Sequence, residues 1–247
     1  MPQHTIDHLS PRVSVGQRPG GRWLLHPLAR AVRDLFQRAM LLPVARIFAR
    51  PLRIDGLDNL QGITGGLILA ANHQSHADSA ILLAALPVAL KRRLVIAAAA
   101  DVMAGTKLVA VLGQVFFGAL PFVRTGLALS SVRQAVALLR DGWAVLIFPE
   151  GHLARDRNGD ELKSGVGLIA AKTSAPVVPV FIAGSRRILP PESHWPRRSP
   201  AAVSFGRPIL YKNQGREIFV EELRKAIEAA GDALIDDDEP AKEAGPV

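Results

Sequence analysis

The chain has 247 residues, a mass of 26.5 kDa and 49% hydrophobic residues, enough to bury the core of one large α/β domain. It contains no cysteine, which excludes disulfide frameworks, thiolate metal sites and a cysteinyl acyl intermediate. The net charge of +8 is unevenly spread, because residues 231–247 hold six acidic residues and one lysine (net −5), which leaves +13 on the rest.

This positive charge favours an anionic partner, either nucleic acid or the headgroup surface of a membrane. The chain has a single tyrosine, only 5% aromatic residues and no interleaving of basic residues with stacking side chains. Nucleic acid is therefore disfavoured as a partner.

The N-terminal 50 residues precede the predicted domain. Residues 1–21 are polar and rich in proline, glycine and arginine, which predicts a disordered leader without a secretory signal. In residues 22–50, apolar positions such as Leu28, Val32 and Leu35 recur at helical spacing among arginines, and Pro43 is expected to break the helix. One interpretation is a helix packed on the domain with a solvated arginine face. We favour an amphipathic segment that contacts a membrane.

From residue 51 to residue 230, short apolar runs alternate with helical patterns, which predicts an α/β domain with a largely parallel central sheet covered by helices. The predicted strands span residues 52–55, 66–71, 94–98, 118–123, 144–148, 177–182 and 202–205. The predicted helices span residues 79–86, 104–112, 128–140, 165–173 and 216–230. Residues 231–247 are expected to form an acidic disordered tail.

The most informative stretch is NHQSHAD at residues 72–78, which follows the apolar run GLILAA. It places His73 five positions before Asp78, where a buried strand is expected to give way to a helix. A carboxylate in the first helical turn can fold back onto one imidazole nitrogen and leave the other nitrogen free. The spacing therefore predicts a histidine held as a general base.

Two other interpretations fit the same residues. Ser75 and Asp78 have the spacing of a capping box at the start of a helix, which explains the aspartate without catalysis. His73, His76 and Asp78 also offer three potential ligands for a metal-dependent hydrolase, although zinc hydrolases usually need a further ligand brought in from elsewhere.

Three further blocks follow this stretch: GALPFVR at residues 118–124, FPEG at residues 148–151 and VVPV at residues 177–180. In this order and at these separations, the four blocks resemble the glycerolipid acyltransferase family, which includes the 1-acylglycerol-3-phosphate O-acyltransferases. The resemblance covers roughly residues 52–210 and implies that residues 51–230 form an acyltransferase domain. It further implies transfer of a fatty acyl chain from acyl-CoA or acyl carrier protein to the free hydroxyl of a lysolipid. No metal or organic cofactor is required by that reaction.

The resemblance assigns roles within the blocks. His73 is the expected base and Asp78 fixes its tautomer. Arg124 is implied to hold the phosphate of the acceptor, most simply 1-acylglycerol-3-phosphate, with phosphatidate as the product. Glu150 is expected to orient Arg124 or to bind a glycerol hydroxyl, while Gly151 lets the ligand approach the backbone closely.

The third block departs from the family pattern. Many relatives continue after FPEG with threonine and then arginine or serine, whereas this chain reads HLAR. Arg155 or Lys163 is expected to supply the missing cation. The departure leaves a different lysolipid acceptor open.

The expected partners are thus an acyl-CoA or acyl carrier protein thioester, a lysolipid acceptor and a membrane surface, at the cytoplasmic face of the cell membrane. Trp195, flanked by arginines at residues 186, 187, 197 and 198, suits a membrane interface. The other interpretation of this stretch is a solvated loop with one packed tryptophan. A non-enzymatic membrane-binding protein, for which His73 would be dispensable, is the remaining alternative.

Overall fold

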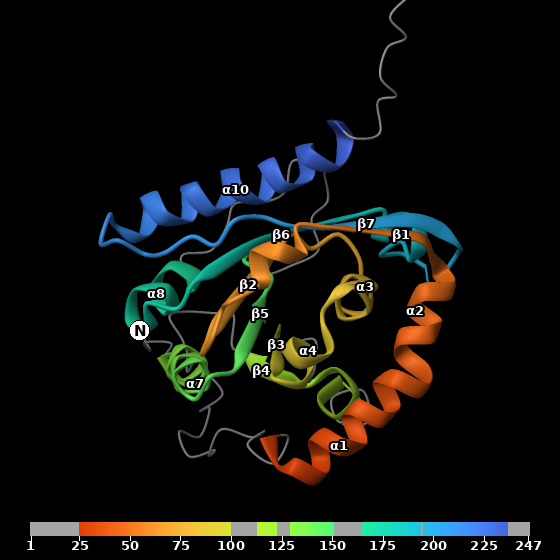
Figure 1. Ribbon diagram of the computed structural model, residues 1–247, viewed down its shortest axis with the longest axis horizontal. Coiled ribbons are helices and arrows are strands. Elements are labelled where there is room, and N and C mark those ends of the chain that lie inside the picture. The colour runs from red at the N-terminus through yellow and green to blue at the C-terminus, as the bar shows by residue number, and fades with distance from the viewer. Residues whose placement is uncertain (1–24, 100–112, 123–128, 151–164, 194, 237–247) are drawn as a thin grey trace, which may run out of the picture.

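The computed structural model describes residues 25–99, 113–122, 129–150, 165–193 and 195–236. Seven strands form one sheet in the order β1-β7-β6-β2-β5-β3-β4, with helices on both faces (Figure 1). The strands are β1 Ala49–Asp55, β2 Leu67–Ala71, β3 Leu94–Ala99, β4 Ala119–Phe122, β5 Ala144–Ile147, β6 Val177–Ala183 and β7 Ser199–Phe205. Each of the seven predicted strands overlaps one of these, and the predicted fold class is confirmed.

The strands run in two directions. β6, β2, β5, β3 and β4 are mutually parallel, whereas β7 pairs antiparallel with β6, and β1 pairs parallel with β7. Five strands therefore end at one edge of the sheet, and β1 and β7 begin at that same edge. Ligands of open α/β sheets gather where the parallel strands end, so this edge is called the carboxyl edge below.

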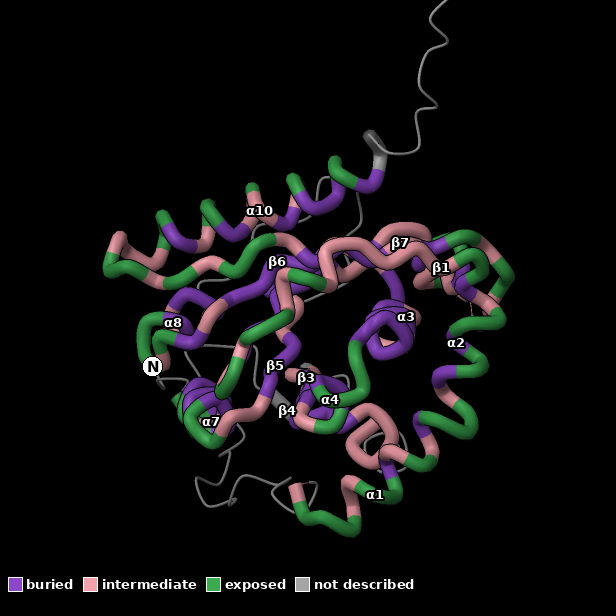
Figure 2. The backbone as a smooth tube through the Cα atoms, in the orientation of Figure 1, coloured by how far each residue is buried: buried purple, intermediate pink, exposed green. Residues whose placement is uncertain are grey.

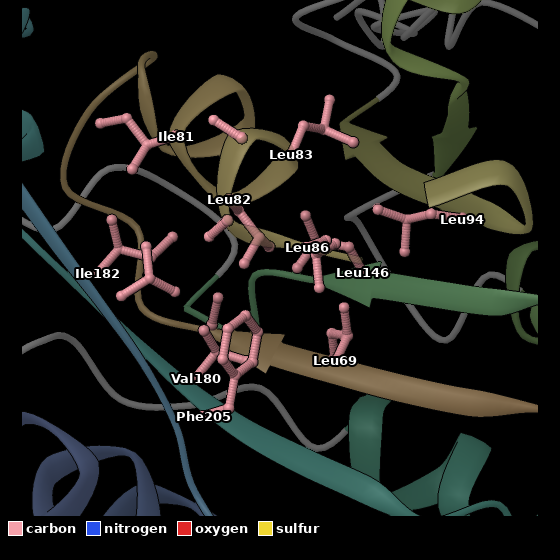
Figure 3. Close-up of a cluster of buried hydrophobic side chains, with 14 of the residues drawn as sticks. Leu69, Ile81, Leu82, Leu83, Leu86, Leu94, Leu146, Val180, Ile182 and Phe205 are labelled. Carbon is pink, nitrogen blue, oxygen red and sulfur yellow. The ribbon is translucent and has the colours of Figure 1, made fainter. Parts of the chain in front are cut away.

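Both faces of the sheet are covered, and the two sides of β2 show why its sequence is apolar at every position. Leu67, Leu69 and Ala71 pack into one cluster with α3 and the N-terminal helices, which is drawn in part in Figure 3. Ile68 and Ala70 pack into a second cluster on the other face, against α7, α8 and α10. The helices on these faces are α3 Asp78–Ala85, α4 Val88–Arg92, α7 Leu129–Arg140, α8 Gly165–Thr173, α9 Ser185–Ile188 and α10 Arg216–Asp236.

The N-terminal segment forms a bent helical arm along one side of the domain (Figure 1). α1 (Pro27–Phe36) begins with Pro27 after the cap residue His26, and α2 (Leu42–Phe48) follows a π-helical turn at Gln37–Leu41. The expected break at Pro43 is wrong. The amide of Leu42 donates to the carbonyl of Gln37, five residues back, and this widened turn accommodates a proline that has no amide hydrogen to donate.

Figure 2 shows which parts of this arm are exposed. The exposed positions include large apolar side chains as well as Arg38 and Arg46, so the outward side of the arm is not a solvated arginine face alone. Its exposed apolar side chains are spaced by four, three, five, four and three residues, and the step of five falls on the π-helical turn. These side chains, called the apolar stripe below, are Leu28, Val32, Leu35, Met40, Val44 and Ile47, each between 44% and 70% exposed. The π-helical turn adds the extra residue that keeps the two halves of the stripe on one side.

The inward side of the arm carries polar groups. Arg33 is only 3% exposed, and burial lowers the pKa of its guanidinium, with a further lowering from Arg30 that Asp34 partly offsets. Gln37 donates from Nε2 to the carbonyl of Phe116 at 2.9 Å. Gln37 and buried apolar side chains such as Leu42 and Ala45 therefore fix the arm to the domain, while the apolar stripe faces outward.

Three further differences from the sequence prediction concern helices. α10 continues to Asp236, six residues past its predicted end, because Ala230, Gly231 and Leu234 extend its buried face. It thereby takes in the first residues of the predicted disordered tail. The short helices α4 and α9 were not predicted, and the helix predicted at residues 104–112 lies outside the described residues.

Within the described segments, no helix has both the length and the apolar character needed to cross a bilayer.

Candidate active site

The turn at residues 72–78 starts from a fixed point at the end of β2. Asn72 is 5% exposed, and its side-chain amide makes two hydrogen bonds to the backbone of Ile182 in β6. The Oδ1 atom accepts from the Ile182 amide at 2.7 Å, and Nδ2 donates to the Ile182 carbonyl at 3.1 Å. Asn72 thus continues the pairing between β2 and β6 by one residue and anchors the turn that follows.

His73 and Asp78 form the predicted pair. The His73 Nδ1 atom lies 2.8 Å from Asp78 Oδ2, and the same oxygen accepts from the amides of Gln74 and Ser75 at 2.8 and 2.9 Å. Asp78 is fully buried. Because the carboxylate accepts, the imidazole proton sits on Nδ1, and Nε2 keeps a lone pair that can take a proton from a substrate.

The capping interpretation of the same residues is also partly correct. Asp78 reaches back to the Ser75 amide, as the acidic residue of a capping box does, but the Ser75 hydroxyl accepts from the amide of Ala77 at 3.0 Å instead of that of Asp78. The hydroxyl donates its own proton to the carbonyl of Leu189 at 2.6 Å. One carboxylate therefore both folds the turn and orients the histidine, and Ser75 serves the turn.

The imidazole of His73 is held from one side by an aromatic ring. Phe148, directly after β5, stacks on it with ring centroids 4.1 Å apart and an angle of 21° between the planes. The His73 side chain remains 17% exposed. The imidazole is thus fixed by Asp78 at its edge and by Phe148 at its face, while part of it stays open to a ligand.

Glu150, from the third block, lies at the same edge. β2 and β5 are parallel neighbours in which Ala70 pairs with Ile147. His73 and Glu150 each follow that pair by three residues, so the first and third blocks leave the sheet side by side. Glu150 is 3% exposed, and the burial of this carboxylate fits a group that orients other side chains rather than one that is freely solvated.

The other predicted site residues lie outside the described part of the chain: these are Arg124, Gly151, Arg155 and Lys163. β4 runs parallel to β3 and ends at Phe122, so the second block leaves the sheet at the carboxyl edge two residues before Arg124. The meeting of Arg124 with His73 and Glu150 stays a prediction.

A metal site at His73, His76 and Asp78 gains no support from the geometry. His76 is exposed, whereas the Nδ1 atom of His73 is engaged with a buried carboxylate. In the described residues, no group of three or more histidine, cysteine, aspartate or glutamate side chains is placed to hold a metal ion.

Sequence reasoning missed the partners that come from other strands. Asn72 was not assigned a role, Phe148 was noted only as part of its block, and the contact between Ser75 and Leu189 joins residues 114 positions apart. Each of these contacts depends on the position of β2 between β5 and β6. The spacing of residues along the chain does not reveal that strand order.

Comparison with known proteins gives the family of the chain. The family model described as Acyltransferase matches residues 51–183. The chain is 28% identical over 141 residues to the chloroplastic 1-acyl-sn-glycerol-3-phosphate acyltransferase BAT2 of Brassica napus, and 27% identical over 143 residues to the chloroplastic 1-acyl-sn-glycerol-3-phosphate acyltransferase LPAT1 of Arabidopsis thaliana. Each match covers 56% of this chain but 38% of the relative's length.

A solved structure shares the fold. The crystal structure of the 1-acyl-sn-glycerophosphate acyltransferase PlsC from Thermotoga maritima superposes with a TM-score of 0.60 at 19% identity, and the match covers 90% of each chain.

Proposed function

Because the chain belongs to the acyltransferase family, we propose that it moves a fatty acyl chain from acyl-CoA or acyl carrier protein to the free hydroxyl of a lysolipid. The proposed acceptor is 1-acylglycerol-3-phosphate, which would give phosphatidate. The observation that carries the reaction is the 2.8 Å contact between His73 Nδ1 and a fully buried Asp78. The acceptor is supported by the names of the two curated relatives.

The proposed chemistry is direct transfer. His73 Nε2 takes the proton of the acceptor hydroxyl as that oxygen attacks the thioester carbonyl, and the Asp78 carboxylate stabilises the imidazolium that forms. The tetrahedral oxyanion then collapses, the carbon–sulfur bond breaks, and the imidazolium returns the proton to the departing thiolate. No enzyme nucleophile takes part, since the chain has no cysteine and Ser75 donates its hydroxyl proton to Leu189.

The acceptor's phosphate requires cations at the same edge. We assign this role to Arg124, with Arg155 or Lys163 as a second cation in place of the one missing after FPEG. Glu150 would orient Arg124 or accept from a glycerol hydroxyl, and Gly151 would admit the ligand close to the backbone. A different lysolipid headgroup is the alternative that this altered block leaves open.

The apolar stripe supports contact with a membrane, proposed here as the cytoplasmic face of the cell membrane. Cations lie on the flank of the arm that faces α3 and α4. Arg38 pairs with Asp34 at 2.9 Å, Asp34 also contacts Arg92 at 3.3 Å, and Arg46 donates to the carbonyl of Ala84 at 3.4 Å. Apolar side chains beside arginines suit the boundary between acyl chains and lipid phosphates.

The test is incubation of the purified protein with labelled acyl-CoA or acyl carrier protein and a panel of lysolipids, with the lipid product identified. We expect acylation of 1-acylglycerol-3-phosphate and a loss of about 10²- to 10⁴-fold in kcat for His73→Ala.

His76→Ala is the matched control and should retain activity, because the imidazole of His76 is exposed and lies three residues along the chain from His73. Undiminished transfer by a folded His73→Ala protein would refute the role of His73, and loss of activity to chelators would favour a metal hydrolase.

A further inference from the structure

The tryptophan between α9 and β7 is presented outward. Trp195 is 81% exposed, more than any other large apolar side chain in the described segments, so the interpretation of a packed tryptophan is wrong. Its backbone is held from both sides by Ser193. The Trp195 amide donates to the Ser193 hydroxyl at 3.2 Å, and that hydroxyl donates to the Trp195 carbonyl at 3.1 Å. A hydrogen-bonded backbone thus holds the ring in solvent. This exposure is unfavourable in free energy, because it leaves a large apolar area in contact with water.

The residues around this ring are cationic. Four arginines near it are exposed, and the only acidic residue between α9 and β7 is Glu192. Arg187 is tied to the start of β7 by a 3.2 Å hydrogen bond from Nε to the Ser199 hydroxyl, and the Arg197 amide closes the loop on the carbonyl of Ile188 at 2.7 Å. We call the group the Trp195 surface: Arg186, Arg187, Trp195, Arg197 and Arg198.

This surface lies at the carboxyl edge. β7 begins at Ser199, which pairs with Ala49 at the start of β1, and Ala49 directly follows α2. The Trp195 surface therefore adjoins the end of the arm that carries the apolar stripe. On its other side, the carbonyl of Leu189 accepts from the Ser75 hydroxyl at 2.6 Å. The segment that carries Trp195 thus joins the membrane-contacting arm to the turn that holds His73.

We propose that the Trp195 surface is a second bilayer contact, with Trp195 in the headgroup layer and Arg197 and Arg198 on the phosphates of anionic phospholipids. A tryptophan ring prefers this depth because its body is apolar and its N–H is polar, and arginine binds phosphate through paired hydrogen bonds. With the apolar stripe as the first contact, two attachments set the carboxyl edge against the lipid. The inference rests on the proposed use of a membrane-borne lysolipid, and it names the part of the chain that brings His73 to it.

A single-tryptophan protein, Trp23→Phe with Trp143→Phe, reports on Trp195 alone. With vesicles of phosphatidylglycerol and phosphatidylcholine, we expect its emission to shift to shorter wavelength and to be quenched by bromine-labelled acyl chains near the headgroups. If this protein binds the vesicles and its emission does not change, the Trp195 surface is not a contact. If its emission shifts with protein concentration in the absence of vesicles, the surface binds a second copy of the chain and the proposal fails.

The role of the arginines is tested by substitutions that remove their charge. Arg197→Gln and Arg198→Gln should each weaken binding to anionic vesicles about fivefold, whereas binding to pure phosphatidylcholine should change little. Arg207→Gln is the matched control, because Arg207 is an exposed arginine at the opposite end of β7. An equal loss of vesicle binding for Arg207→Gln would refute a local site.

His73→Ala separates this inference from the proposed function, since it should abolish transfer and leave the Trp195 signal intact. A protein that binds no vesicles at all overturns the inference even if it acylates lysolipids in detergent.

Discussion

At the scale of single residues, one oxygen atom determines much of the candidate site. Asp78 Oδ2 accepts from the His73 imidazole and from the amides of Gln74 and Ser75. The same three contacts that fix the proposed base also fold the turn, so catalysis and local stability are expected to depend on one side chain.

Substitution of that carboxylate should separate the two roles. Asp78→Asn keeps an acceptor oxygen and the side-chain shape but removes the charge that stabilises the imidazolium. We expect kcat to fall about 10²- to 10⁴-fold, with a loss of about 1–3 kcal/mol in the free energy of unfolding from weakened buried hydrogen bonds. Steady-state kinetics and urea unfolding measure the two effects. A full loss of stability with normal activity per folded molecule would contradict the assignment.

Gly118, before β4, offers a second prediction at this scale. It has a φ of +66°, and an added Cβ would lie 2.6 Å from Nη1 of the buried Arg33. Gly118→Ala should destabilise the protein by about 1–3 kcal/mol, from backbone strain and displacement of the arginine. Gly142→Ala is the control, since Gly142 has a φ of +81° but an added Cβ would lie no closer than 4.0 Å to its neighbour, the Cα of Gly65. Equal losses of unfolding free energy in the two variants would show that the contact with Arg33 carries no cost.

The pairing of His73 with Asp78 could be predicted because it depends on a five-residue spacing at a strand end. The stacking of Phe148 and the anchoring by Asn72 could not, because they need the order of the strands in the sheet. Glu150 was placed correctly at the edge, since the apolar run before it ends where Pro149 and Gly151 indicate a turn.

At the scale of elements, the N-terminal arm shows how a helix can turn its apolar side outward. The helical spacing of Leu28, Val32 and Leu35 was readable from the sequence. Which side of the helix faces the domain was not, because burial of an arginine is rare and requires specific partners. The π-helical turn was missed because proline alone predicts a break. The irregular step from Leu35 to Met40 is the signal that could have revealed it.

The apolar stripe predicts a distinct pattern of mutational effects. Leu28→Gln and Leu35→Gln, at positions 69% and 70% exposed, should leave the free energy of unfolding nearly unchanged and weaken vesicle binding by roughly tenfold each. Leu42→Gln is the contrasting control, since Leu42 is 7% exposed and packs in the core, so it should cost stability. Vesicle sedimentation and thermal unfolding distinguish the two classes. Stability losses in Leu28→Gln and Leu35→Gln would mean that the stripe packs against protein.

At the scale of the whole molecule, the reversal of β1 and β7 brings three features to one edge. The sequence predicted a largely parallel sheet, and its apolar runs look the same whichever way a strand points, so the reversal could not be read from them. It places the end of α2 and the start of β7 where the other five strands end. The end of the arm, the Trp195 surface and the turn that holds His73 therefore lie at one edge of the sheet.

The charge of the molecule predicts how membrane binding responds to salt. The net charge is +8, and arginines border both proposed contacts. Raising NaCl from about 0.05 to about 0.5 M should weaken binding to anionic vesicles by about tenfold or more, because screening shortens the reach of exposed charges. Vesicles of phosphatidylcholine alone serve as the control and should be bound almost independently of salt. Salt-independent binding to anionic vesicles would assign attachment to the apolar stripe alone.

The double hydrogen bond of Asn72 has a consequence for how the enzyme can be monitored. The amide hydrogen of Ile182 is covered by the Asn72 side chain, so it can exchange with deuterated solvent through this route only when the start of the turn at residues 72–78 opens. A peptide from β6, 110 positions away along the chain, would then report the opening rate of the histidine's own segment. Slowed deuterium uptake there in the presence of a lysolipid would register occupancy of the site without a chemical label.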